Sequence, residues 1–195
     1  DRVTIYPRYT AILDITKIYN MSDFEKKIRK DRRQDLRYAK KDNLEVYEET
    51  NFKNVENLIN KVAKNKSYLN TNIKTLIKKI IHHVVKFKFG SLIAVKNKKS
   101  EIISLQLIVW DSKSGHALLN LNHPKYLSAG ISSLIYKEMI NICIKKKISF
   151  LDLNGANSFN RADFKHSFYT KPQLYFHMSW PNSGRDFYEN VEANQ

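Results

Sequence analysis

Residues 91–122, SLIAVKNKKSEIISLQLIVWDSKSGHALLNLN, decide the fold class of this chain. Two short polar turns divide the stretch into apolar runs at 91–95, 102–110 and 116–122. In the middle run, one face of an extended chain would carry Ile103, Leu105, Leu107 and Val109. This period of two indicates a strand with a buried face, and connections this short exclude parallel crossovers. The stretch therefore predicts an antiparallel meander of three strands.

Helical and extended patterns flank the meander on both sides. Before it we expect a strand at 10–15, a strand at 44–48, and helices at 52–62 and 73–85. Between the first two strands we expect a basic helical segment that extends to about Asn43, and the spacing of Ser22 and Glu25 is that of a capping box at its start. After it we expect a helix at 131–143, a strand at 149–153, a short helix at 162–168 and a strand at 174–180. This order predicts an α/β (α+β) fold with a mixed, mostly antiparallel sheet and helices on both faces.

The composition points to an anionic partner or substrate. The 195 residues suffice for about one domain. Lys and Arg number 34 and Asp and Glu 19, which gives a net charge of +15 and a pI near 9.7. Nucleic acid, a nucleotide, or an anionic lipid or glycan would each complement this charge.

Several protein classes are excluded. The single cysteine, Cys143, excludes a disulfide framework and a cysteine-based zinc finger, and it fits a reducing compartment. No apolar run reaches the roughly 20 residues of a membrane span, and the opening residues DRVT do not form a signal peptide. The chain does not begin with Met, so we expect a fragment whose natural beginning is missing.

Four stretches resemble motifs of one family. Residues 30–46, KDRRQDLRYAKKDNLEV, resemble an R-x-x-I-R-x-A-x-K-x-G-(V/L)-x-V segment, and 163–168, DFKHSF, resemble an F-K-x-x-F-G element. Between them, AGISSL at 129–134 and FLDLNG at 150–155 are similar to a G-A-S-x-L-L helix start and an F-D-F-G-G strand. Motifs in this order are those of Fem-type aminoacyltransferases within the GNAT acyltransferase superfamily. The resemblance spans about residues 10–180.

The resemblance implies a domain arrangement and a reaction. Fem-type proteins usually contain two GNAT-like halves, so we expect residues 1–180 to form a single GNAT-like domain, the C-terminal part of a longer protein, followed by a polar tail at 181–195. Peptidoglycan-bridge members take an amino acid from aminoacyl-tRNA and place it on the amine of a lipid- or nucleotide-linked cell-wall peptide. Other relatives use acyl-CoA. We expect a cytoplasmic transferase without a permanently bound cofactor, whose co-substrate is aminoacyl-tRNA or acyl-CoA and whose acceptor is a phosphate-bearing envelope precursor at the membrane surface.

Phe164 and Lys165 are the candidates for catalysis. Amide formation passes through a tetrahedral intermediate whose oxyanion needs a hydrogen-bond donor, and the resemblance gives the lysine at the position of Lys165 this role. Phe164 would stack on the terminal base or sugar of a tRNA, or form a wall of the pocket. The alternative is a surface lysine beside a core aromatic residue. Tyr169 stands where the family often has Gly, so we expect a different local turn.

Two segments are candidates for binding phosphate. Every fourth residue is basic at Arg29, Arg33, Arg37 and Lys41, which would form one ridge on a helix. Guanidinium groups bind phosphate through paired hydrogen bonds, so this ridge would hold a tRNA backbone or a pyrophosphate. A solvated, helix-stabilising face is the alternative.

The loop before the helix at 131–143, with Ser128 and Gly130, is the second phosphate candidate, because the N-terminus of a helix attracts anions. CoA-dependent relatives usually show a Q/R-x-x-G-x-G/A loop there, and this chain has one glycine. Side chains restrict the approach of backbone to phosphate, which favours a donor other than acyl-CoA. Alternatively, Gly130 only permits close packing of the helix on a strand.

The candidate general bases are His123, His166 and Asp152. No Ser-His-Asp or Cys-His spacing accompanies them, so substrate or water would carry the proton in the alternative mechanism. His82 and His83 lack the spacing of a metal site, so we expect no metal. Cys143 lies on an apolar helical face, which favours a core position.

Three functions remain open at this stage. The first is aminoacyl-tRNA-dependent transfer, which the glycine-poor loop, the net charge and the Phe164–Lys165 pair favour. The second is acyl-CoA-dependent N-acetylation or N-acylation of a glycan, a lipid or a small amine. The third is a non-catalytic module that binds nucleic acid or another anionic surface.

Overall fold

The computed structural model describes residues 3–63, 71–126 and 129–179, so the tail predicted at 181–195 lies outside it. In this part of the chain one sheet contains β1 (Thr4–Asp14), β2 (Glu45–Glu48), β3 (Gly90–Lys96), β4 (Ile102–Trp110), β5 (Ser114–Asn122), β6 (Phe150–Gly155) and β7 (Lys171–Ser179). The helical segments are η1 (Ile15–Lys17), α1 (Met21–Lys27), α2 (Lys30–Lys41), α3 (Phe52–Ala63), α4 (Thr71–Phe87), α5 (Ala129–Lys146) and α6 (Phe159–His166). None of these described helices has the length and apolar composition that crossing a membrane requires.

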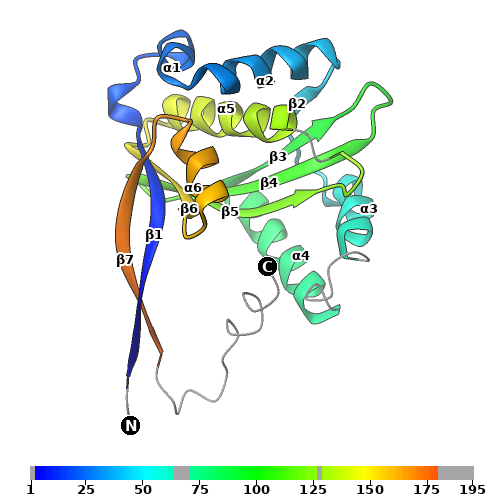
Figure 1. Ribbon diagram of the computed structural model, residues 1–195. Helices are drawn as coiled ribbons and strands as arrows, with labels where there is room; N and C mark the ends of the chain where they lie inside the picture. The colour runs from blue at the N-terminus through cyan, green and yellow to red at the C-terminus, as the bar shows by residue number, and fades with distance from the viewer. Residues whose placement is uncertain (1–2, 64–70, 127–128, 180–195) are drawn as a thin grey trace.

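The strands lie in the order β2-β3-β4-β5-β6-β1-β7 (Figure 1). Every neighbouring pair is antiparallel except β5 and β6, which are parallel. The meander predicted for 91–122 is confirmed, because β3, β4 and β5 are successive antiparallel neighbours. The apolar strand predicted at 149–153 is β6, which lies inside the sheet. The predicted mixed, mostly antiparallel sheet is therefore confirmed.

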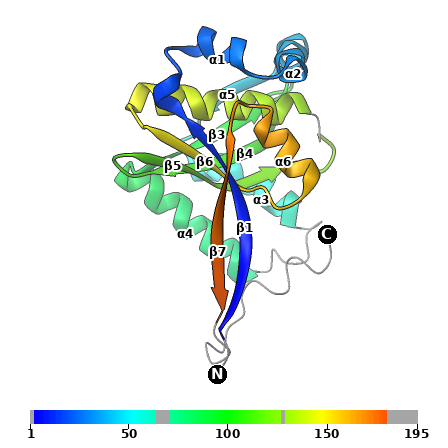
Figure 2. The same cartoon turned by 60° about the vertical axis from the view of Figure 1, so that its left-hand side comes forward.

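Helices cover both faces of the sheet, as the sequence predicts. In Figure 1, α1, α2 and α5 lie above the sheet, and α3 and α4 lie below it. The buried apolar residues form two groups, one on each face of the sheet. Ile135 of α5 belongs to the group that includes Leu151 of β6. Ile81 of α4 belongs to the group that includes Leu105 of β4. Figure 2 shows α6 beside β1, on the same side of the sheet as α5.

The basic segment predicted as one helix is two helices. Ile28 and Arg29, between α1 and α2, have extended backbones with ψ of 154° and 150°. The Ile28 side chain is buried, and the Arg29 N–H donates to the carbonyl of Ser167 at 2.9 Å. A tertiary contact therefore replaces a helical hydrogen bond here. Neither glycine nor proline marks the break, which is why the sequence pattern did not predict it.

The start of α1 also differs from the prediction. Asn20 is the N-cap, and its side chain accepts a hydrogen bond from the N–H of Asp23 at 2.9 Å. Ser22, the predicted cap, lies inside the helix. Asn and Ser are both favourable N-cap residues, so residue type alone does not predict whether Asn20 or Ser22 caps the helix.

Helix α2 lies across the first turns of α5. A Cβ atom added at Gly130 would lie 3.1 Å from the carbonyl oxygen of Asp35. Nearby, the hydroxyl of Ser133 donates to the Asp35 carboxylate at 2.9 Å. The missing side chain at Gly130 therefore permits close packing of α5 against another helix, not against a strand as the alternative reading predicted.

We expect Gly90→Ala to lower the free energy of unfolding by about 1–3 kcal/mol, because overpacking a tight contact has this cost. The new Cβ atom would overlap the carbonyl oxygen of Ile108 and would lie 2.5 Å from Cγ1 of Val84. Urea unfolding followed by circular dichroism measures the change. Gly115→Ala is the matched control, since its Cβ atom would meet only side chains, at 3.4 Å or more. Equal losses in the two variants would contradict this account.

Candidate active site

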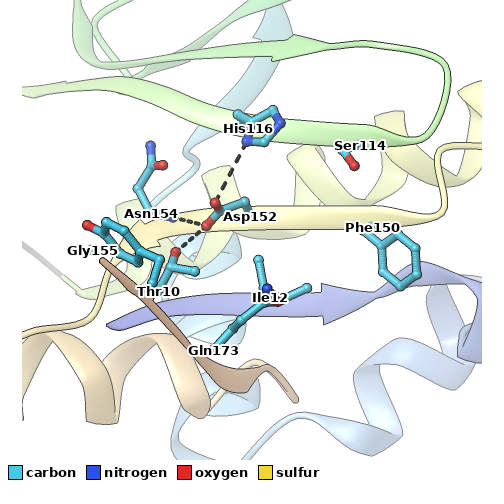
Figure 3. A pocket seen from close by; sticks show the side chains of 10 residues that line it. Thr10, Ile12, Ser114, His116, Phe150, Asp152, Asn154, Gly155 and Gln173 are labelled. Atoms are coloured by element: carbon cyan, nitrogen blue, oxygen red, sulfur yellow. Dashed lines mark hydrogen bonds and ion pairs between the residues drawn. The ribbon is translucent and has the colours of Figure 1, made fainter. Parts of the chain in front are cut away.

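An open hollow of about 590 Å³ lies over β5, β6, β1 and β7 (Figure 3). Its lining side chains are mainly polar: Thr10, Ile12, Ser114, His116, Phe150, Asp152, Asn154, Gln173 and Tyr175, with the backbone of Gly155. A hollow of this size is in the range of small-molecule sites.

Strand alternation directs polar side chains of β6 into this hollow. Leu151 and Leu153 are buried in the core beneath α5. Asp152 and Asn154 alternate with them and therefore point to the opposite face of the sheet. Thr10 of β1 lies on this same face. At β6, the α5 side of the sheet is thus packed in the core, and the opposite side carries the polar groups.

Asp152 is at the centre of the hollow. Its Oδ1 accepts hydrogen bonds from the hydroxyl of Thr10 and from the N–H of Asn154, the latter at 2.7 Å. Its Oδ2 lies 3.7 Å from Nδ1 of His116 (Figure 3). The side chain of Asp152 is 20% exposed and that of His116 is 45% exposed. One carboxylate oxygen is therefore fixed, and the other faces an imidazole that a ligand can reach.

Strands β5 and β6 separate at the same place. Their pairing extends over three residue pairs and ends at His116 and Asp152. Beyond this point the side-chain amide of Asn154 donates to the carbonyl of Ala117 and so bridges the two strands. Asn154 has a left-handed backbone with φ of 61°, a conformation that asparagine tolerates better than most residues. The strands are thus splayed beside the Asp152 carboxylate.

Lys165 of α6 reaches this splayed region from the other side of β6. Its Nζ donates to the carbonyls of Asn154 at 2.9 Å and Gly155 at 2.6 Å. Both residues line the hollow, although the Lys165 side chain itself does not. An ammonium group has three N–H donors, and within the described chain these two carbonyls are its acceptors. Lys165 therefore has a third N–H donor besides the two that these carbonyls accept.

Burial lowers the pKa of Lys165 to about 8. The negative charge of Asp152 opposes this shift, and the positive charge of Arg161 adds to it. At neutral pH the ammonium form predominates, and the neutral amine becomes the major form above about pH 8. A lysine of this kind is able both to stabilise an oxyanion and to exchange a proton near neutral pH.

Phe164 lies in an aromatic group on the α5 side of the sheet. Its ring centroid is 5.4 Å from that of Tyr136 and 5.2 Å from that of Phe168, and the guanidinium of Arg32 lies 4.8 Å from its centre. These contacts are those of a partly buried core residue, and Phe164 does not line the hollow. A direct contact of Phe164 with substrate stays a prediction.

Two arginines of the predicted basic ridge bind the protein itself. Arg29 precedes α2 and pairs with Asp31 and with Asp163, at 2.6 Å to the latter. Arg33 donates to the carbonyl of Ile28. The Arg29–Asp163 pair joins the start of α2 to α6, the helix that carries Lys165, and so helps to fix the position of that lysine.

The remaining phosphate candidates lie near the start of α5. Arg37 and Lys41 are exposed on α2. Gly130 lies against α2, and Ser128 lies outside the described residues. Phosphate binding by these residues stays a prediction.

Of the three candidate bases, Asp152 alone lines the hollow. The ring of His123 packs on that of Tyr126, with centroids 5.1 Å apart, and burial lowers the pKa of His123. Nδ1 of His166 lies 2.9 Å from the hydroxyl of Thr170. These two histidines occupy other parts of the fold.

Sequence reasoning did not single out His116 and Thr10. Both stand on strands whose apolar neighbours alternate, so their direction was predictable, but the strand order that brings them to Asp152 was not. Among the described residues no group of His, Cys, Asp and Glu could hold a metal ion. Cys143 is fully buried, as predicted, and burial raises the pKa of its thiol to about 12.

The mostly antiparallel sheet, with one parallel pair and helices on both faces, has a GNAT-like fold. No protein-family model matches the sequence, and neither does any curated protein. Solved structures do match. FemX superposes with a TM-score of 0.67 at 11% identity over 88% of this chain, and L-PGS from Bacillus licheniformis with 0.64 at 11% identity over 92%.

A third similar structure is a GCN5-related glucosamine N-acetyltransferase region of a fungal β-N-acetylglucosaminidase. Its TM-score is 0.58 at 8% identity, and the match covers 91% of this chain and 21% of the fungal one. The chain spans about three fifths of FemX and of L-PGS, 62% of each. At these identities the likeness is one of fold.

We expect Asp152→Asn to lower the pKa of Lys165 further below about 8, because the Asp152 carboxylate is the charge that raises it. The pH dependence of acetic anhydride labelling, read by mass spectrometry at Lys165, measures this pKa. Asp42→Asn is the control, since Asp42 is exposed at the end of α2 and does not contribute to the pKa of Lys165. An unchanged pKa in Asp152→Asn would show that the carboxylate does not act on the lysine.

Proposed function

We propose that this protein is an acyltransferase that moves an aminoacyl group from aminoacyl-tRNA to an amine of a cell-envelope precursor. The single observation that carries the proposal is the position of Lys165 and Asp152 on either side of β6, where β5 and β6 separate. The fold shared with FemX and with L-PGS, a lysyl-phosphatidylglycerol synthetase, supports the same class of reaction.

Each group would have a distinct part in the reaction. The acceptor amine attacks the ester carbonyl of the donor, a C–N bond forms, and the carbonyl oxygen becomes an oxyanion. The third N–H of the Lys165 ammonium would stabilise this oxyanion. The Asp152 carboxylate, with His116 beside its Oδ2, would accept the proton that the amine loses.

Collapse of the intermediate breaks the C–O bond of the donor ester. The leaving ribose hydroxyl then takes up the proton that Asp152 and His116 received, so the site returns to its starting state. No covalent intermediate with the protein is required. Positioning of the two substrates accounts for the remaining contribution of the site.

The anionic partners follow from the charge of the chain. Both a tRNA and a phosphate-bearing envelope precursor complement a net charge of +15. We place the reaction in the cytoplasm at the membrane surface, where a charged tRNA and a lipid-linked precursor meet. No permanently bound cofactor is part of this proposal.

We expect Lys165→Met to reduce the rate of transfer by about tenfold or more, as removal of one oxyanion donor does elsewhere. The protein is incubated separately with charged tRNA and with acyl-CoA, and mass spectrometry detects acylation of an amine-bearing envelope precursor. Lys113→Met, which changes an exposed lysine, is the control and should retain the full rate. Melting temperatures identify any variant that fails to fold.

Each other result has a definite meaning. An undiminished rate in Lys165→Met would overturn the role of this lysine. Transfer from acyl-CoA alone would replace the donor in this proposal with acyl-CoA. Salt-dependent binding of tRNA with no transfer to any amine would instead support a non-catalytic binding module.

A further inference from the structure

Helices α4 and α5 cover opposite faces of the sheet, and both terminate at the same end of it. Helix α4 leads into β3 through residues 86–89, KFKF, and α5 leads into β6 through residues 145–150, KKKISF. The N–H of Trp110 donates to the carbonyl of Phe89 at 2.8 Å, and Nζ of Lys146 lies 5.5 Å from the centre of the Trp110 ring. Trp110 therefore joins the two segments into one surface, which we call the basic end.

The basic end carries five lysines and no acidic residue. All five are exposed: Lys86, Lys88, Lys145, Lys146 and Lys147. Within the described chain no carboxylate forms an ion pair with any of them. The neighbouring turn contributes no net charge, because it contains one acid, Asp111, and one base, Lys113. A surface with this charge complements an anionic partner.

Three exposed phenylalanines accompany these lysines. Phe87 is 61% exposed, Phe89 is 42% exposed and Phe150 is 43% exposed. The ring of His83 lies 5.9 Å from that of Phe87, and Nζ of Lys86 lies 5.4 Å from the centre of the Phe87 ring. Apolar rings that gather on a surface in this way are typical of a site that binds a partner.

The dipoles of the two helices explain only part of this composition. Lysines in the last turn of a helix, such as Lys86 and Lys146, are favourable beside its free carbonyls. The dipole gives no reason for phenylalanines at the same place, since an apolar ring is more stable when it leaves water. The rings and the cations together therefore indicate a partner that has both an apolar layer and an anionic layer.

An anionic bilayer has both of these layers. Clusters of about four to eight basic residues bind anionic headgroups, and aromatic rings beside them enter the boundary between headgroups and acyl chains. Nucleic acid fits less well, because neither segment contains an arginine, the side chain that pairs with phosphate through two hydrogen bonds. A second copy of this chain would place like charges against each other.

The basic end borders the hollow around Asp152. Phe150 and Ser114 line that hollow, and Figure 3 shows both of them on the other side of Asp152 from Asn154. A lipid-linked acceptor in a bilayer at the basic end would therefore reach Asp152 by passing Phe150.

We propose that the basic end is the surface by which this protein docks on an anionic phospholipid bilayer, with Phe87, Phe89 and Phe150 among the headgroups and the lysines on the lipid phosphates. This inference rests on the proposed function, because it supplies the contact with the membrane that carries the acceptor. Docking itself requires no acyl transfer, so it is measured separately.

The first test measures binding to vesicles by sedimentation. The vesicles contain phosphatidylcholine alone or phosphatidylcholine mixed with phosphatidylserine. The variant is Lys86→Gln/Lys88→Gln, and the control is Lys98→Gln/Lys125→Gln, which changes two exposed lysines beyond the opposite ends of β3 and β5. Both variants have a net charge of +13, since 15 − 2 = 13, so general electrostatic attraction is matched.

We expect the wild type to bind the vesicles that contain phosphatidylserine, and Lys86→Gln/Lys88→Gln to bind them about tenfold or more weakly, because each lysine near an anionic surface contributes to binding. The control should bind nearly as the wild type does. Equal weakening in both variants, or no binding of the wild type to these vesicles, would overturn the inference.

The phenylalanines distinguish a bilayer from nucleic acid. We expect Phe87→Ser/Phe89→Ser to bind the same vesicles about tenfold or more weakly, because two apolar rings no longer leave water, and to bind uncharged tRNA as the wild type does. The control is Tyr19→Ser/Phe159→Ser, which changes two rings that are each 85% exposed. Vesicle binding that is unchanged in Phe87→Ser/Phe89→Ser, or an equal loss of tRNA binding, would overturn the inference.

Trp110 provides a measurement that requires no change at the basic end and that decides the matter if the other variants do not fold. In Trp180→Phe, Trp110 is the one remaining tryptophan. We expect vesicles with brominated acyl chains and phosphatidylserine to quench its fluorescence, because Trp110 lies between the two docked segments. Binding to these vesicles without quenching would show that another surface docks, which would overturn the inference.

Failure of this inference is distinguishable from failure of the proposed function. Docking by a protein that transfers no acyl group would retain the membrane surface and reject the enzyme. Transfer to a water-soluble acceptor by a protein that binds no vesicle would reject the membrane surface and retain the enzyme.

Discussion

The arrangement of the candidate site depends on the early end of the parallel pairing between β5 and β6. Three residue pairs join the two strands, and past them Asn154 replaces the ladder with a single side-chain bridge to Ala117. Past the end of this pairing, the carbonyls of Asn154 and Gly155 accept hydrogen bonds from Lys165. Lys165 thereby lies close enough to Asp152 for the carboxylate to raise its pKa, and the described residues show no direct ion pair between the two groups.

Much of the fold was predictable because it depends on local periodicity. The three strands of 91–122, the helix later found as α4 and the buried strand β6 each have a pattern that fixes their type and their buried face. The break at Ile28 was not predictable, because it depends on a hydrogen bond to Ser167, far away in the chain. Tertiary contacts outweigh helix propensity at such positions.

The candidate site was predictable only in part, for a similar reason. Asp152 and Lys165 were predictable as site residues from their residue types and from the motifs around them. His116 and Thr10 reach Asp152 because β5 and β1 are the two neighbours of β6. When a residue reaches a site only because of the order of strands in the sheet, no local pattern in a single sequence predicts its place there.

The basic residues of the chain divide into two groups that composition does not distinguish. Arg29 and Arg33 satisfy carboxylates and a backbone carbonyl, and they join α1, α2 and α6 into one unit. Lys86, Lys88 and Lys145 have no such partner among the described residues and are exposed at the basic end. The net charge therefore indicates the sign of the charge on a binding partner. The ion pairs within the protein decide which basic side chains are left to bind that partner.

The place of β1 in the sheet has a consequence for biosynthesis. Thr10 pairs with Gly155 on one side and with Gln173 on the other, so β1 is translated well before both of the strands that it pairs with. The sheet is therefore completed after most of the chain has emerged, and pairings this distant in sequence form slowly. Until then the apolar side chains of β1 have no partner strand, and unpaired strands of this kind favour aggregation.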